Sequence, residues 1–166
     1  MEESEKMRIS FEQELENLNE SLTEMGTRVE KIIENTFEAF RNNDRDALEK
    51  IISGDGDVDR MEKDIESKCL SLMLRQQPVA RDLRHISMAL KVVTDLERIG
   101  DHAVDIAELA MRLDQKDAES MIGYLPEMVE NVKSMLRESI TAFVNKDREL
   151  ARSMEERDDI IDGLFN

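Results

Sequence analysis

The sequence predicts an all-α protein, a bundle of helices, and three observations carry that prediction. Apolar residues recur every three or four positions along most of the 166 residues, which is the spacing of one helix face. The chain holds only two prolines and six glycines, the residues that most often interrupt helices. Aromatic residues make up 4% of it, so the core is expected to consist of Leu, Ile, Val and Met.

A first long helix is predicted from Phe11 to Phe40. Its apolar residues form one seam: Phe11, Leu15, Leu18, Leu22, Met25, Val29, Ile32, Ile33, Phe37 and Phe40. Ser10 precedes this seam and is predicted to cap the start of the helix. The run Asn42-Asn43-Asp44 predicts a turn, with Asp44 as the N-cap of the next helix.

The next helical segment, from Ala47 to Met73, is predicted to be interrupted near its middle. Gly54 and Gly56 lie two positions apart there, and together they cost a helix about 2 kcal/mol relative to alanine. We therefore expect a kink or a short break. Pro78 suits the first turn of a third helix, because its missing N–H is not needed there, and the apolar pattern carries that helix to about Leu113.

After a polar stretch the apolar pattern starts again, 103 residues further on. The matches at this offset include Met25 with Met128, Val29 with Val132, Phe40 with Phe143, Asn42 with Asn145 and Asp44 with Asp147. We predict a duplication, with a three-helix repeat over residues 8–114 and a partial second repeat of two helices over 118–166. An apolar strip on the second repeat is expected to need a third helix or another chain as its cover: Ile140, Phe143, Leu150, Ile161 and Leu164.

The net charge of the chain limits the classes of partner that it could bind. The formal net charge of −16 argues against nucleic acid, which needs clustered Lys and Arg, and suits cations or a basic protein surface. Cys69 is the single cysteine, so no disulfide framework is expected. No apolar run approaches the roughly 20 residues of a membrane span, and the acidic N-terminus does not fit a secretory signal. We expect a cytoplasmic protein.

Pairs of acidic residues share a spacing of four positions: Asp55 and Asp59, Glu97 and Asp101, and Asp158 and Asp162. The first and last pairs are also related by the offset of 103. Residues four apart lie on one helix face, about 5–6 Å apart between Cβ atoms, where like charges repel unless a cation lies between them. The spacing thus indicates a cation site, and the alternative is a set of solvated acidic faces.

Two runs at the start and in the middle of the third predicted helix are highly specific as sequence motifs: QQPVARDLR from Gln76 to Arg84 and DLERIGDHA from Asp95 to Ala103. With the opening MRISFEQEL at Met7–Leu15, they closely resemble the PhoU family of phosphate-transport regulators. The resemblance covers the whole chain. It implies two tandem three-helix bundles, of which this sequence lacks the last helix with its second copy of the LERIGDH segment. It also implies negative control of the phosphate-starvation response, between a phosphate ABC transporter and a sensor histidine kinase.

The resemblance further implies a multinuclear metal cluster on the acidic pairs, with iron as the first candidate and zinc, manganese or magnesium as alternatives. Asp55, Asp59, Glu97 and Asp101 would form the first-repeat site, and Asp158 and Asp162 half of a second. The predicted partner-binding residues are Gln77, Arg81, Arg84 and Arg98. His102 is expected to be a hydrogen-bonded interior residue, and His85 a surface or packing residue. A homodimer is expected.

Other classes of function are weighed against this one. A diiron-carboxylate, ferritin-like oxidase uses Glu-x-x-His, but Asp82 and Ile99 stand three residues before His85 and His102. No glycine-rich phosphate loop occurs, nor a Ser or Cys nucleophile with a recognisable partner. A helical adaptor that binds no metal stays open. We predict a metal-binding cytoplasmic regulator that is not an enzyme.

Overall fold

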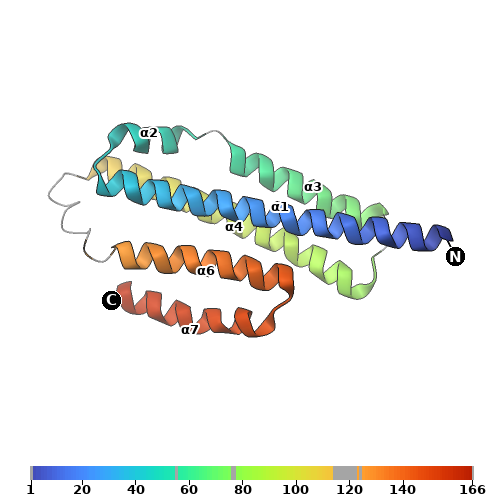
Figure 1. Cartoon of the computed structure of the whole chain (residues 1–166). Coiled ribbons are helices and arrows are strands. Elements are labelled where there is room, and N and C mark those ends of the chain that lie inside the picture. Colours follow the sequence, from blue (N-terminus) through green and yellow to red (C-terminus); the bar gives the residue numbers. More distant parts are fainter. Residues whose placement is uncertain (1, 55, 76–77, 114–122, 124, 166) are drawn as a thin grey trace. The chain divides into compact units, whose positions relative to one another are not determined.

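The protein is all-α in a computed structural model that describes residues 2–54, 56–75, 78–113, 123 and 125–165 (Figure 1). Within those residues the helices are α1 (Glu2–Arg41), α2 (Arg45–Ser53), α3 (Asp57–Arg75), α4 (Ala80–Arg112), α6 (Leu125–Asn145) and α7 (Arg148–Phe165). No strand occurs in that described part, and the predicted fold class is confirmed. None of its helices is long and apolar enough to cross a membrane.

The chain packs as two compact units. Unit 1 comprises Met1–Met25 and Gly56–Arg98, and unit 2 comprises Gly26–Asp55 and Ile99–Asn166, so α1 and α4 each contribute to both. These packing units are a different division of the chain from the predicted repeats, 8–114 and 118–166. The repeat boundaries therefore stay a prediction.

Unit 1 contains the N-terminal part of α1, all of α3 and the N-terminal part of α4. Its largest fully buried side chains come from all three segments: Leu18, Leu22, Met25, Ile65, Cys69, Leu72, Ile86 and Val93. Polar contacts add to this core, because the Lys68 Nζ donates to the Ser21 Oγ at 2.6 Å. The part of the predicted apolar seam from Leu18 to Met25 is thus buried in the core that α1 shares with α3 and α4.

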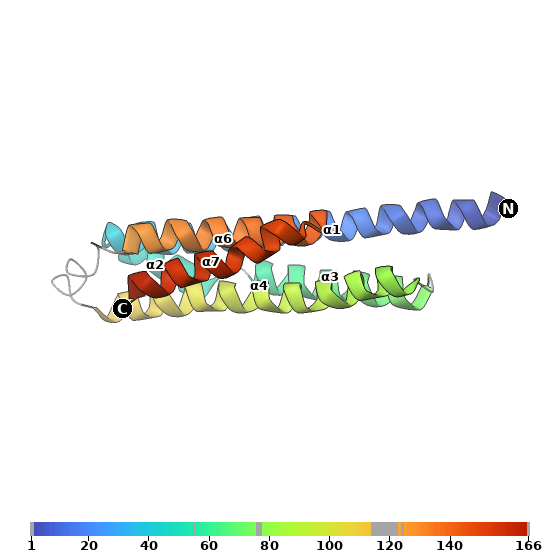
Figure 2. The same ribbon diagram turned by 90° about the horizontal axis from the view of Figure 1, so that it is seen from below.

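Unit 2 contains the second part of α1, α2, the end of α4, α6 and α7. Its buried apolar side chains are Val29, Ala39, Phe40, Leu48, Ala103, Ala107, Leu136, Ile140 and Ala142. The Thr36 hydroxyl donates to the Ala103 carbonyl at 3.4 Å, which ties α1 to α4. α6 runs beside this part of α1, and α7 returns along α6 (Figures 1 and 2).

The turn after α1 is repeated after α6. Asn43 and Lys146 have positive φ angles of 49° and 56°, and the next residue in each turn donates its N–H to a carbonyl five positions back at 2.8 Å. Asp44 then caps α2 by accepting from the Ala47 N–H at 3.0 Å, as predicted. Asp147 accepts from the Leu150 N–H at the same distance. Equivalent turns at an offset of 103 support the predicted duplication.

The predicted interruption between α2 and α3 is confirmed. Gly54 and Gly56 have φ angles of 50° and 65°, a left-handed conformation that costs a glycine little and other residues more. At the offset of 103 the corresponding residues are Arg157 and Asp159. Because no glycine stands there, α7 continues through the equivalent position as one helix.

Some local predictions were wrong. Ser10 does not cap α1, because the helix already begins at Glu2. Pro78 lies before α4 and not in its first turn. The first backbone hydrogen bonds of the helix run from the Asp82 and Leu83 N–H groups to the Val79 carbonyl at 2.9 Å, so Val79 is the residue directly before the helix. Ile140 is only 6% exposed and does not belong to an uncovered strip, because α1 covers it at Gly26.

The other members of the predicted strip are intermediate in exposure, namely Phe143, Leu150 and Ile161. The side chain of Leu164 lies outside the described residues.

Candidate functional site

The structure places two of the three predicted acidic pairs on single helices, as their spacing predicted. Glu97 and Asp101 lie one turn apart on α4, and Asp158 and Asp162 one turn apart on α7. Asp59 lies in the first turn of α3. The aspartates among these are exposed and Glu97 is half-buried, so the carboxylates are accessible to ions from solvent. Asp55 lies outside the described residues.

The carboxylates suit a hard cation by their chemistry, but the described pairs offer an incomplete ligand set. Two carboxylates supply at most four oxygens, whereas Mg²⁺ takes about six ligands, so water or further side chains would have to complete the shell. No group of three or more His, Cys, Asp or Glu side chains is arranged to hold a metal ion within the described ranges. The metal cluster therefore stays a prediction.

The environment of His85 agrees with the packing role that was one of its two predicted alternatives, whereas that of His102 does not agree with its prediction. His102 is exposed, with its Nδ1 3.5 Å from the Asp105 Oδ2, so the expectation of an interior residue was wrong. His85 is 9% exposed, and its Nε2 lies 2.9 Å from the Asn19 Oδ1 on α1. His85 is adjacent to Ile86 on the face of α4 that packs inside unit 1.

The predicted partner-binding residues are accessible where the structure describes them. The Arg81 side chain is 84% exposed, with its Nε 3.9 Å from the Asp82 Oδ1. Arg84 is exposed as well, and its Nε donates to the Ala80 carbonyl at 3.4 Å. Arg98 is exposed, and its Nη1 lies 3.5 Å from the Asp95 Oδ1. Gln77 lies outside the described residues.

The sequence analysis missed exposed apolar side chains close to these arginines in the chain. Leu74 at the end of α3 is 81% exposed, and Val79 just before α4 is 65% exposed. The segment from Ser67 to Thr94 also carries five basic residues and a single acidic one, in a chain with a net charge of −16. The hairpin between α3 and α4 is therefore locally basic and apolar, a combination typical of docking surfaces.

An apolar pocket of about 400 Å³ lies inside unit 2, between α1, α4 and α6. Apart from Thr36 and His102, its lining is hydrophobic, and it includes Phe37, Ile106, Leu109, Met128 and Val129. This pocket was not predictable from the sequence. The apolar patterns of the three helices indicated a shared core, but not a space left between them.

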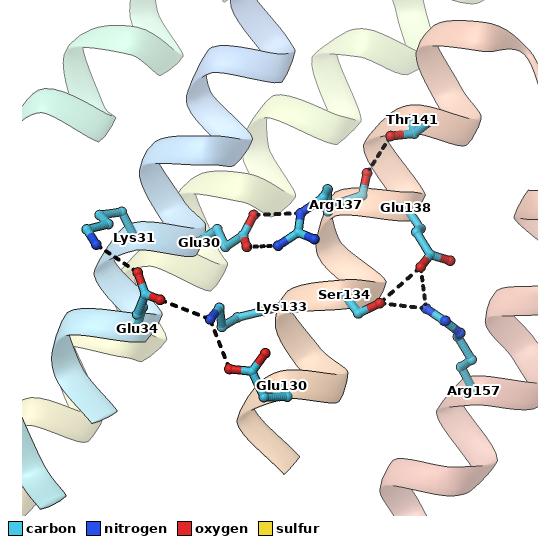
Figure 3. A network of polar contacts seen from close by, with 10 residues as sticks. All are labelled: Glu30, Lys31, Glu34, Glu130, Lys133, Ser134, Arg137, Glu138, Thr141 and Arg157. Atoms are coloured by element: carbon cyan, nitrogen blue, oxygen red, sulfur yellow. Dashed lines mark hydrogen bonds and ion pairs between the residues drawn. The ribbon is translucent and has the colours of Figure 1, made fainter. Parts of the chain in front are cut away.

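Ion pairs that the sequence analysis also missed join α6 to α1 (Figure 3). Arg137 binds the Glu30 carboxylate with two donors, one of them the Nε at 3.3 Å from Oε2. The Lys133 Nζ donates to the Glu34 Oε1 at 3.2 Å and to the Glu130 Oε1 at 3.0 Å. Two cations on α6 thus meet two carboxylates on α1.

Lys133 is nearly enclosed, since only 8% of the residue is exposed. Its hydrogen bond to Glu130, together with that to Glu34, raises the pKa of Lys133. Glu34 also accepts from the Lys31 Nζ at 2.8 Å, and the bonds from Lys31 and Lys133 hold the pKa of Glu34 below its usual value. Both groups are therefore held in their charged forms at neutral pH.

A smaller polar cluster joins α7 to α6. The Arg157 Nη1 lies 2.9 Å from the Glu138 Oε1 and donates to the Ser134 Oγ at 3.0 Å (Figure 3). Ser134 in turn donates to Glu138 at 3.0 Å. Within unit 2, α6 therefore makes ionic contacts on two of its sides.

The family model for the PhoU domain matches residues 22–110 and 125–166, which is most of the chain. This chain belongs to the PhoU family. A phosphate-specific transport system accessory protein PhoU homolog of Clostridium acetobutylicum is 42% identical over 156 residues, 93% of this chain and 71% of that protein. A homolog of the same name from Aquifex aeolicus is 36% identical, over 92% of this chain and 69% of its own length.

Solved PhoU structures agree with this membership. PhoU from Pseudomonas aeruginosa has a TM-score of 0.82 and 31% identity, covering 93% of this chain and 75% of that chain. The phosphate transport system regulatory protein PhoU from Streptococcus pneumoniae has a TM-score of 0.83 and 27% identity, covering 93% and 73%. The predicted family is confirmed. The names of these relatives describe accessory and regulatory proteins of phosphate transport.

Proposed function

We propose that this PhoU-family chain is a cytoplasmic adaptor, not an enzyme, that links a phosphate ABC transporter to a sensor histidine kinase. In this role it would negatively control the phosphate-starvation response. The observation that carries the proposal is similarity over 93% of the chain to a relative named as an accessory protein of the phosphate-specific transport system. The exposed basic and apolar residues of the α3–α4 hairpin support a docking role, since both kinds of side chain are open to a partner.

The experiment that tests the adaptor role deletes the gene in its own host and follows a phosphate-starvation reporter in phosphate-rich medium. We expect the reporter to be expressed constitutively, and the intact chain to restore repression. The variant Arg81→Glu/Arg84→Glu should fail to restore it, because it reverses two exposed charges of the hairpin. The matched control, Arg148→Glu/Arg152→Glu, makes the same charge change at exposed positions of α7 and should restore repression.

A reporter that stays repressed after deletion would refute the regulatory role. Equal restoration by both double variants would leave regulation in place but refute the hairpin as the docking surface.

We also propose that the acidic pairs bind a metal cluster, with iron as the first candidate and zinc, manganese or magnesium as alternatives. The residues that would hold it are Asp55, Asp59, Glu97, Asp101, Asp158 and Asp162. The spacing of four, its repetition at an offset of 103 and the exposure of the described aspartates support this proposal. A bound cation would remove the repulsion between paired carboxylates and so stabilise the helical turn that carries them.

Metal content of the purified chain, measured by plasma mass spectrometry, tests the cluster. We expect bound metal in the parent protein and its loss in Asp59→Asn and in Asp101→Asn. The control is Asp95→Asn, which removes an exposed aspartate of the same helix α4 that has no acidic residue four positions away. A parent protein free of metal after incubation with iron, manganese or zinc would refute the cluster and leave a metal-free adaptor.

The proposal includes a homodimer, which rests on the family resemblance. Light scattering coupled to size-exclusion chromatography distinguishes a dimer from the 19.2 kDa monomer. A mass of one chain at micromolar and higher concentration would refute it.

A further inference from the structure

The two ion pairs between α1 and α6 are related to each other by the internal repeat. At the offset of 103, Glu30 corresponds to Lys133, and Glu34 corresponds to Arg137. Exchanging the roles of the two helices therefore converts the pair Glu30–Arg137 into the pair Lys133–Glu34. Both pairs occur in the structure, so this contact has a local pseudo-twofold symmetry (Figure 3).

Packing at the same contact departs from this relation. A Cβ added to Gly26 of α1 would overlap the side chain of Ile140 of α6, so the two helices approach closely there. The positions related by the offset are Val129 and Phe37. Both of them line the apolar pocket between these helices. The two helices thus approach closely at one end of the contact and leave a pocket at the other end. The pseudo-twofold relation therefore holds for the ion pairs but not for the packing.

The charges break this symmetry in a consistent direction. α1 carries carboxylates at both of its positions, and α6 carries cations at both of its equivalent positions. If the same face of a second α1 took the place of α6, each glutamate would meet a glutamate. Two α6 faces would bring Lys133 against an arginine. Lys133 is 8% exposed, so a cation in the place of Glu34 would bring like charges together at a nearly enclosed position. Only Glu130 of its own helix would remain as its partner, which is unfavourable.

The four side chains are named the interface charges: Glu30, Glu34, Lys133 and Arg137. We propose that the interface charges select α6 as the partner of this face of α1 and exclude the same face of a second copy of the chain. A duplicated protein with like residues at both positions could pair its first repeats between chains through a true twofold contact. Opposite charges at equivalent positions favour pairing within unit 2, so any homodimer must use another surface.

A charge exchange tests this proposal on the full chain. The variant Lys133→Glu/Arg137→Glu should lose α6 docking, and the backbone amides of α6 should exchange hydrogen at least about tenfold faster. Adding Glu30→Lys and Glu34→Lys restores opposite charges between the helices with the order reversed. Exchange should become at least about threefold slower than in the double variant, while staying faster than in the parent because Lys31 and Glu130 then lie beside like charges. The matched control is Lys146→Glu/Arg148→Glu, which makes the same change of charge at exposed positions and should behave as the parent.

Oligomeric mass gives a second readout, because the fourfold variant should stay in the same state as the parent. The proposal is overturned if the double variant exchanges as slowly as the control. It is also overturned if the fourfold variant is no better protected than the double variant. If the double variant fails to fold, the fourfold variant still tests the proposal, because it contains the same two substitutions. A folded fourfold variant would show that the four charges act as pairs, and an unfolded one would overturn the proposal.

Discussion

Replacing Gly26 by alanine tests how closely α1 and α6 approach in unit 2. In a helix interior, glycine to alanine normally gains about 1 kcal/mol of stability from helix propensity. Here the new Cβ would overlap the far end of the Ile140 side chain, which must move. Overpacking a core costs about 1–3 kcal/mol, and a value of about 2 kcal/mol applies because the overlap is close but a side-chain end can rotate away. We expect a net loss of about 1 kcal/mol.

Gly163 of α7 is the matched control. Apart from the adjoining residues and the backbone of α7 itself, no atom of the described residues lies within 4 Å of a Cβ added there. Gly163→Ala should therefore show only the propensity gain, up to about 1 kcal/mol. The same chemical change is thus expected to have opposite signs at the two positions, and the two variants should differ by about 2 kcal/mol.

Urea unfolding followed by circular dichroism measures both variants, and thermal unfolding provides a check, since about 1 kcal/mol corresponds to roughly 3 °C for a chain of this size. Ile140→Val removes the overlapping carbon. It should cost about 1 kcal/mol in the parent and clearly less in the Gly26→Ala background, because it then relieves the overlap. If Gly26→Ala stabilises the protein as much as Gly163→Ala does, α6 does not approach α1 as described and the reasoning fails.

The remaining predictions concern unit 1. Leu72→Ala should cost about 2–5 kcal/mol, because Leu72 is 1% exposed, whereas Leu74→Ala, on the same helix and 81% exposed, should cost under about 0.5 kcal/mol in the same urea assay. Burial raises the pKa of the Cys69 thiol from 9.0 to about 11, so the folded protein should resist alkylation at pH 8 until it is unfolded. The unfolded thiol loses its proton more readily, so the free energy of unfolding should fall as the pH rises from about 9 towards 11; an unchanged value in pH-dependent urea titrations would contradict this. Asn19→Ala should cost about 1–3 kcal/mol, because the buried His85 loses its contact at 2.9 Å, and a loss below about 0.5 kcal/mol would show that this contact is replaced by water.

Most of the fold could be predicted because its determinants are local. An apolar residue every three or four positions defines a helix face whatever lies opposite, and Asp44 caps α2 through a hydrogen bond to a residue three positions away. Gly54 and Gly56 interrupt the helix by their own backbone conformation. The errors at Ser10 and Pro78 arose where a residue suited to a helix end lies inside the helix or just before it.

The positions of Glu97 with Asp101 and of Asp158 with Asp162 were predictable for the same reason, since a spacing of four on one helix fixes which side chains share a face. Whether further helices complete a site around them depends on residues distant in sequence. The spacing within one helix does not show which other helices lie beside the paired carboxylates.

By itself, the sequence determined the helical class, the Asp44 cap and the family, and it predicted the duplication. The tertiary structure decided what each helix face meets, which left His102 exposed instead of interior and buried Ile140 against Gly26. It also paired Lys133 with Glu34, 99 positions away. The physical reason is that helical periodicity defines a face but not its rotation against a neighbour, which is set by close packing and by the need to pair a buried charge.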